Sequence, residues 1–262
     1  MLTFLKLGGS LITDKRVEAA FRQETATRLA IEIAAAWRQD ETLQLLIGHG
    51  SGSFGHFAAS QHDTIHGVHT AEQWRAFAQV ATVAAELNYL VAKTLQAADV
   101  PVWRIQPSAS ASSRDGVLRD MAIDPIRRAL SSGLVPLVYG DVSLDEVRGG
   151  TIISTETIFF YLAQHLPVKR ILLLGEVEGV LDAAGAVIPV ITVQNFGDVA
   201  HALGGSAGTD VTGGMKTKVR DMLSLAQRVE GLQIRVMDGR QPGLLRETLL
   251  SHAHPGTLIA AD

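Results

Sequence analysis

Three glycine-rich segments hold the residues of this sequence that could perform chemistry. They cover residues 6–10 (Lys-Leu-Gly-Gly-Ser), 48–56 (Gly-His-Gly-Ser-Gly-Ser-Phe-Gly-His) and 210–218 (Asp-Val-Thr-Gly-Gly-Met-Lys-Thr-Lys). Glycine lets the backbone approach a ligand closely, and successive backbone N–H groups form sites for anions. Lysine adds a positive charge that attracts phosphate. Together, the segments indicate phosphate chemistry.

The segment 48–56 follows an apolar run and has four glycines within eight residues. An ordinary connection avoids the entropic cost of so many glycines, so close approach to a ligand explains them better than a structural turn. The segment has neither the Walker pattern nor the Rossmann spacing. Lys6 lies inside another apolar run, which suggests that its ammonium group reaches a site at the strand end. The alternative is a plain turn beside a lysine whose stem packs on apolar surface.

The segment 210–218 places two lysines in the first turn of an expected helix. Positive charge is unfavourable there because the helix dipole favours acidic residues, so an anionic ligand would explain it. Lys216 and Lys218 are two residues apart and point about 200° apart on a helix. Only one of them can face a site, and the other is expected on the surface.

The histidines and the absence of cysteine narrow the chemistry further. His62, His66 and His69 have spacings that could meet on a helix, but Gly67 and the lack of a nearby acidic partner favour a loop without a metal. His49 is interpreted as serving the structure of its loop. With no cysteine in the chain, disulfides, thiolate metal sites and a cysteine nucleophile are excluded. No serine lies in a nucleophile elbow.

The elements that must position these segments alternate along the whole chain. Apolar runs separated by amphipathic segments predict an α/β fold, a three-layer αβα sandwich with a mostly parallel central sheet and inserted β-hairpins. The hairpins are expected around 115–116 and within 142–152. Strands are expected at 3–7, 43–47, 102–105, 135–139, 170–174 and 233–236, and helices at 26–37, 74–95, 124–133 and 219–226. They form one domain over 1–262, divided into lobes 1–167 and 168–262.

Composition limits the possible partners. The 262 residues carry a net charge of −4, with a pI near 6.1, which argues against nucleic-acid binding. Apolar runs are far shorter than the roughly 20 residues of a membrane span. Residues 1–7 lack the apolar centre of a signal peptide, so we expect a cytoplasmic protein without membrane contact.

The three segments, in this order, resemble those of the amino acid kinase superfamily, and the similarity runs nearly end to end. The segments that carry the resemblance are 6–15, 49–56, 106–108, 139–142, 149–156, 176–180 and 210–218. Within the superfamily the sequence looks most like the isopentenyl phosphate kinases. The ending Ser53-Phe54-Gly55-His56 is the most specific part, because kinases of carboxylate acceptors lack this histidine.

The resemblance implies ATP-dependent phosphorylation of a small phosphate monoester, with Mg²⁺, by a homodimer. Lobe 1–167 would bind the acceptor and lobe 168–262 the nucleotide. The implied catalytic residues are Lys6, Lys15, His56, Glu156 and Lys218. ATP would contact Lys6, Gly8, Gly9, Ser10, Ser51, Glu176, Gly179, Val180, Leu181, Asp210, Thr212, Gly213 and Lys218. The acceptor would contact Gly50, Ser51, Gly52, His56 and Gly149, and its tail would reach Phe77 and Val80 if their helix face is not simply core.

The sequence departs from the family pattern in four places. Glu156, Glu176 and Glu178 stand where aspartate is usual, and Ser51 replaces a common glycine. Glu156 matches the carboxylate that orients the catalytic lysines, and its extra methylene moves that group by about 1.5 Å. No charge is lost, so an active enzyme is expected. A kinase of another phosphate or phosphonate, such as the phosphonate-antibiotic kinases, and a non-catalytic nucleotide-binding regulatory protein remain the alternatives.

Overall fold

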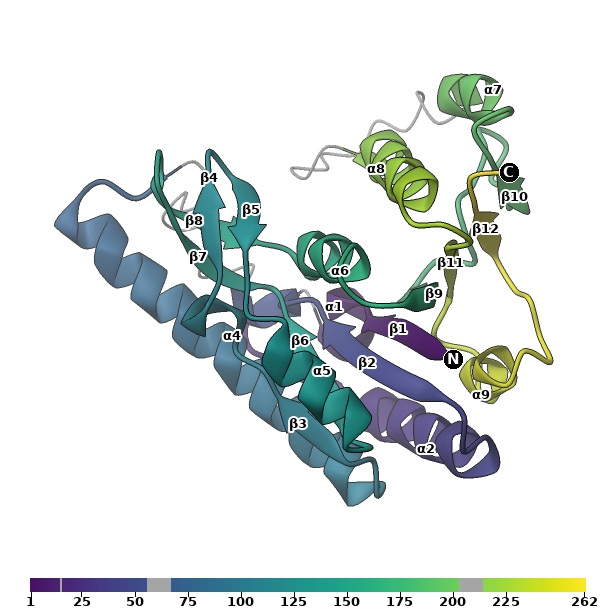
Figure 1. Cartoon of the computed structure of the whole chain (residues 1–262), viewed down its shortest axis with the longest axis horizontal. Coiled ribbons are helices and arrows are strands. Elements are labelled where there is room, and N and C mark those ends of the chain that lie inside the picture. The colour runs from purple at the N-terminus through teal and green to yellow at the C-terminus, as the bar shows by residue number, and fades with distance from the viewer. Residues whose placement is uncertain (15, 56–66, 203–213) are drawn as a thin grey trace.

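The computed structural model describes residues 1–14, 16–55, 67–202 and 214–262. An eight-stranded sheet crosses the molecule in the order β10-β12-β11-β9-β1-β2-β6-β3 (Figure 1). Every neighbouring pair in it is parallel except β11 and β12. The strands are β1 (Leu2–Leu7), β2 (Gln44–His49), β3 (Val102–Arg104), β6 (Val135–Tyr139), β9 (Val168–Gly175), β10 (Val190–Ile191), β11 (Gln233–Asp238) and β12 (Thr257–Ile259). All six expected strands are present, and the predicted fold class is confirmed.

Helices cover both faces of this sheet, so the molecule has three layers. On one face, a buried apolar cluster joins the sheet to α1 (Gly9–Ile12), α2 (Gln23–Gln39), α4 (Ala71–Ala97) and α9 (Leu244–Leu249). On the other face, a second cluster joins it to α5 (Asp124–Ser131), α6 (Thr155–Ala163), α7 (Phe196–Ala202) and α8 (Gly214–Arg228). None of the described helices is long and apolar enough to span a membrane.

The alternation of side chains along β1 determines where its lysine points. Leu5 and Leu7 belong to the cluster beneath α2 and α4, whereas Leu2 and Phe4 belong to the cluster beneath α6 and α8. Successive side chains of a strand point to opposite faces. Lys6 therefore lies on the face of α6 and α8, at the carboxyl end of a central strand.

The two predicted hairpins are present and join in a second sheet, with the order β5-β4-β7-β8. Its strands are β4 (Ser112–Arg114), β5 (Val117–Asp120), β7 (Asp141–Asp145) and β8 (Gly149–Ile153), and β4 pairs with β7 in parallel. Asp145 connects the two hairpin turns, because its carboxylate accepts hydrogen bonds from the N–H groups of Asp115, Gly116, Val147 and Arg148. A short 3-10 helix, η2 (Pro107–Ala109), precedes this sheet.

The two expected lobes share the large sheet. Strand β1 pairs with β2 on one side and with β9 on the other, so residues before and after 167 are joined by a continuous ladder. The carboxyl ends of β1, β2, β9 and β11 therefore meet at one edge. In open α/β sheets, ligands bind at this edge.

Candidate active site

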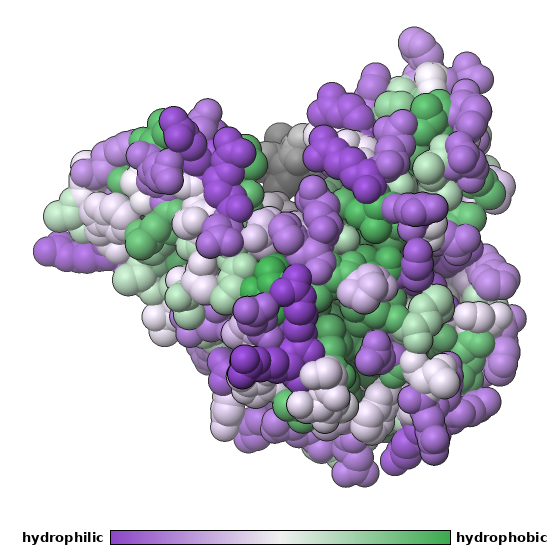
Figure 2. Space-filling view, in the orientation of Figure 1, coloured by the Kyte–Doolittle hydropathy of each residue, from purple (hydrophilic) through white to green (hydrophobic). Residues whose placement is uncertain are grey.

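A cavity of about 330 Å³ lies at the carboxyl ends of β1, β9 and β11. Figure 2 shows the molecule hollowed between the hairpin sheet and α8, with hydrophilic residues along both rims. The cavity brings together many of the residues expected from the sequence. Its lining includes Lys6, Gly8, Gly9, Ser10, Gly50, Ser51, Gly52, Glu156 and Lys218.

The charged centre of the cavity consists of two lysines and one carboxylate. Lys6 Nζ donates a hydrogen bond to Glu156 Oε1. Glu156 lies in the first turn of α6, which begins where the Ser154 hydroxyl accepts a hydrogen bond from the N–H of Thr157 at 3.0 Å. Burial alone would raise the pKa of Glu156, but the charges of Lys6 and Lys218 lower it below its usual value. The carboxylate is therefore ionised at neutral pH, and the centre keeps a net charge of +1.

The two lysines of α8 differ as the helical angle predicts. Lys218 lines the cavity, whereas Lys216 is exposed and is not part of the lining. The charge of Lys218 acts on Glu156 from α8, while Lys6 acts from β1. Three elements that are far apart in sequence thus supply the charged centre.

Two of the glycine segments meet so closely that only glycine fits. A Cβ atom on Gly9 would lie 2.6 Å from the Gly52 nitrogen, and a Cβ atom on Gly8 would lie 2.5 Å from the Leu174 oxygen. Gly52 also has a φ of +51°. Thr13, which the sequence reasoning gave no role, ties the segments together: its hydroxyl donates to the Gly9 oxygen at 2.7 Å and accepts from the Ser53 N–H at 2.9 Å.

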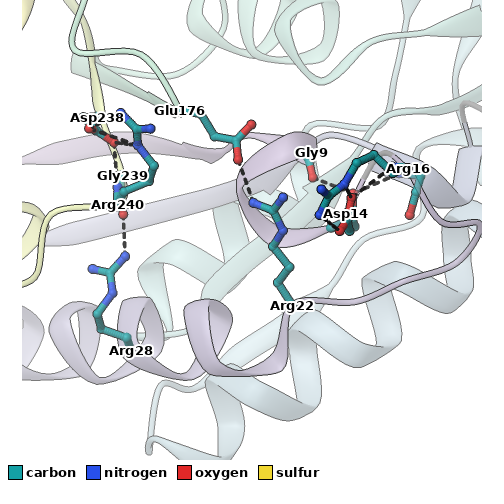
Figure 3. A network of polar contacts seen from close by, with 11 residues as sticks. Gly9, Asp14, Arg16, Arg22, Arg28, Glu176, Asp238, Gly239 and Arg240 are labelled. Atoms are coloured by element: carbon teal, nitrogen blue, oxygen red, sulfur yellow. Dashed lines mark hydrogen bonds and ion pairs between the residues drawn. The ribbon is translucent and has the colours of Figure 1, made fainter.

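The segment after β9 is held in place by contacts of its side chains and backbone. Glu176 forms an ion pair with Arg22 at 2.6 Å, which joins this segment to the start of α2 (Figure 3). Val180 is fully buried in the core, and its N–H donates to the Thr257 hydroxyl at 2.8 Å. The Val180 oxygen accepts a hydrogen bond from the Ile188 N–H at 2.9 Å, so its backbone groups already have partners. A Cβ atom on Gly179 would lie 2.7 Å from the same hydroxyl. Leu181 is partly exposed in a bridge to Val187.

Phe77 and Val80, expected at the acceptor tail, lie close to Gly149, which was expected at the acceptor itself. Phe77 packs against Gly150, and Val80 is buried against Val142. Gly149 has a φ of +75° and lies against the backbone of Val68. None of these is among the described residues that line the cavity. Lys15, His56, Asp210, Thr212 and Gly213 lie outside the described residues.

The apolar part of the lining was missed by the sequence reasoning. Leu173 and Val236 belong to the same buried cluster as Phe4, on the face of the sheet that Lys6 also occupies, and alternation along β9 and β11 could have identified them. Met215 and Met222 complete the wall from α8. The cavity thus has glycine amides on one side, which suit phosphate oxygens, and an apolar wall on the other, which suits an uncharged part of a ligand.

The sequence pattern of the amino acid kinase family matches residues 1–238. The chain belongs to the amino acid kinase family. An isopentenyl phosphate kinase of Haloferax volcanii is 38% identical, over 92% of this chain and 97% of its own length. One of Methanothermobacter thermautotrophicus is 33% identical over 98% of each chain. A solved structure described as an isopentenyl phosphate kinase superposes with a TM-score of 0.82 at 30% identity, covering 99% of this chain and 100% of that one.

Proposed function

We propose that this member of the amino acid kinase family is an isopentenyl phosphate kinase, which transfers the γ-phosphate of ATP to isopentenyl phosphate. The observation that carries the proposal is the Lys6–Glu156–Lys218 centre between two glycine segments. The relatives that share most of the chain's length bear this name and support the choice of acceptor.

The electrostatics of the cavity fit a reaction between two anions. Two unit charges 4 Å apart repel each other by about 4 kcal/mol at an effective dielectric constant of about 20. Lys6 and Lys218 offset this repulsion at the point of transfer. Phosphoryl transfer needs mainly positioning and charge stabilisation, and a phosphate oxygen is already a competent nucleophile. No general base is therefore required of the chain.

The lining suits phosphate oxygens better than a directly bound cation. Within the described ranges, no three His, Asp or Glu side chains gather to form a metal site. The side-chain oxygens of the cavity come from Ser10, Ser51 and Glu156, and Glu156 already pairs with Lys6. We infer that Mg²⁺ enters with ATP, held by phosphate oxygens and water. When bound, the ion neutralises charge on the β- and γ-phosphates.

The proposal also covers where each substrate binds and the oligomeric state of the protein. Lobe 168–262 would bind ATP against the wall of β9, β11 and α8, and lobe 1–167 would bind the acceptor at Gly50–Gly52. As the resemblance implies, the chain would act as a cytoplasmic homodimer. Light scattering of the purified protein tests the dimer.

The deciding experiment measures ATP-dependent turnover of the purified protein over a panel of acceptors. The panel comprises isopentenyl phosphate, shorter and longer alkyl phosphates, a small phosphonate and N-acetylglutamate. We expect the highest kcat/KM with isopentenyl phosphate. A preference for the phosphonate or the carboxylate would replace the proposed acceptor, and binding of ATP without any turnover would support a regulatory protein.

A further inference from the structure

A buried chain of polar groups runs from the surface to the glycine segment that follows β2. Arg104 Nε, on β3, donates to Asn88 Oδ1, on α4, at 2.8 Å. Asn88 Nδ2 lies 3.1 Å from His49 Nε2, and His49 Nδ1 lies 3.0 Å from the Gly50 oxygen. His49 and Asn88 have no exposed surface. The chain therefore connects three elements to a residue that lines the cavity.

The chemistry of Arg104 fixes the direction of every hydrogen bond in this chain. A guanidinium group only donates, so Asn88 Oδ1 accepts and the Asn88 amide nitrogen faces His49. His49 Nε2 must then accept, which leaves the proton on Nδ1, where it is donated to the Gly50 oxygen. Burial lowers the pKa of His49 to about 4, and the charges of Arg104 and Lys6 also lower it. His49 is therefore a neutral ring in one tautomer at neutral pH.

Fixing the Gly50 carbonyl also fixes the next N–H group. The peptide between Gly50 and Ser51 is planar and trans, so its N–H points opposite to its carbonyl. The carbonyl is held by His49, which lies on the α4 side of the sheet, and Lys6 lies on the opposite side. Among the described residues, none accepts a hydrogen bond from the Ser51 N–H, and Ser51 lines the cavity. This N–H is thus available to a ligand.

We propose that His49, Asn88 and Arg104 are positioning residues that aim the Ser51 N–H at the phosphate of the acceptor, an inference that rests on the proposed function. None of the three touches the substrate in this account. His49 acts through the Gly50 carbonyl, and the other two hold His49 in the tautomer that donates to it. The ring of His49 also stacks on Tyr139, with 5.8 Å between centroids and an interplanar angle of 8°, so its position does not depend on polar contacts alone.

Three substitutions of His49 separate the hydrogen bond to Gly50 from simple packing. His49→Asn places an amide nitrogen near the position of Nδ1 and can still donate to the Gly50 oxygen. His49→Gln places its amide near the position of Nε2 and loses that donor, and His49→Phe keeps only the stacked ring. We expect the KM for isopentenyl phosphate to rise about three- to ten-fold in the Gln and Phe variants, as for one lost hydrogen bond. The Asn variant should stay within about two-fold of wild type.

The KM for ATP and kcat serve as internal controls in the same assays. An interaction made equally in the ground and transition states affects KM and leaves kcat nearly unchanged. An unchanged KM for ATP also shows that a variant is folded. Arg104→Ala, at an exposed position, should raise the acceptor KM by about two-fold through the same chain. If the wild type is active and all variants have its acceptor KM, the positioning role is overturned. If the wild type shows no turnover, the proposed function is overturned.

The tautomer of His49 tests the chain without any activity measurement. In a ¹⁵N-labelled sample, the His49 resonance is identified by its loss in the His49→Gln variant. We expect a neutral ring protonated at Nδ1 in the wild type and a doubly protonated ring in Asn88→Asp, because the new carboxylate can only accept from Nε2. A wild-type ring protonated at Nε2 would contradict the inference, since the Gly50 carbonyl would then have no donor.

Discussion

The two lysines at the start of α8 offer a matched pair of substitutions. Lys218 lines the cavity, and Lys216, two residues earlier, is exposed on another side of the same helix. Either change to alanine removes one positive charge from the same turn and alters helix propensity equally. The pair therefore isolates the effect of a charge that faces the transferring phosphoryl group.

The expected loss for Lys218→Ala follows from Coulomb's law. A unit charge about 4 Å from a phosphoryl oxygen interacts with it by about 4 kcal/mol at an effective dielectric constant of about 20. Lys218 is half-buried, so solvent screens part of this energy. We expect kcat to fall by about 10²- to 10³-fold, the effect typical of removing one donor that stabilises transition-state charge. Lys216→Ala should remain within about three-fold of wild type.

The assay couples ADP release to a dehydrogenase signal at saturating ATP and isopentenyl phosphate. Thermal melts of both variants control for folding, and titrations with ATP give the KM for ATP alongside kcat. Equal losses in the two variants, or a larger loss for Lys216→Ala, would refute the assignment of Lys218 to the charged centre.

Three further predictions concern the acceptor and the hairpin sheet. His56→Ala should weaken acceptor turnover about ten- to a hundred-fold with little change in ATP binding, because a charge-assisted hydrogen bond contributes about 1.5–3 kcal/mol. His56→Gln should keep part of the acceptor turnover. A loss confined to ATP affinity would assign the segment 48–56 to the nucleotide. Phe77→Ala should raise the ratio of kcat/KM for ten- over five-carbon isoprenyl phosphates, since each buried methylene contributes about 0.8 kcal/mol; an unchanged ratio in a folded variant would make Phe77 core. Burial would raise the pKa of Asp145, but hydrogen bonds from four backbone N–H groups lower it to about 2. The ionised carboxylate therefore stabilises the folded protein fully above the pKa of about 3.9 that Asp has in the unfolded chain. This stabilisation is lost as the pH falls through about 2. Asp145→Asn should cost about 1–3 kcal/mol at pH 7 and less at pH 2, measured by urea unfolding; an equal cost at both pH values would contradict the ionic role.

The strands that stand out as apolar runs could be predicted from sequence, whereas β10 and β12 could not. Strands β1, β6 and β9 are mostly buried and largely apolar, as expected for parallel strands covered on both faces. Strands β10 and β12 have two and three residues, too few to show a period. Helix α6 was missed for a related reason: six of its nine residues are apolar (Ile158, Phe159, Phe160, Tyr161, Leu162 and Ala163), so it lacks an amphipathic stripe.

The candidate site was predictable only where local sequence carries the signal. Lys6 stands out as a charge in an apolar strand, and the α8 lysines stand out against the helix dipole. Glu156 was identified through the family resemblance, because nothing local distinguishes it from a helix-start glutamate. The His49–Asn88–Arg104 chain and the Arg22–Glu176 pair join residues from separate elements, and only tertiary structure brings them together.

The identity of the product tests the central claim most directly. Purified protein is incubated with ATP, Mg²⁺ and isopentenyl phosphate, and the mixture is followed by ³¹P NMR. We predict that isopentenyl phosphate is converted to a diphosphate ester, seen as two coupled phosphorus signals, with one ADP formed for each ester. Unchanged isopentenyl phosphate beside intact ATP, or ADP formation that yields only inorganic phosphate, would contradict the account.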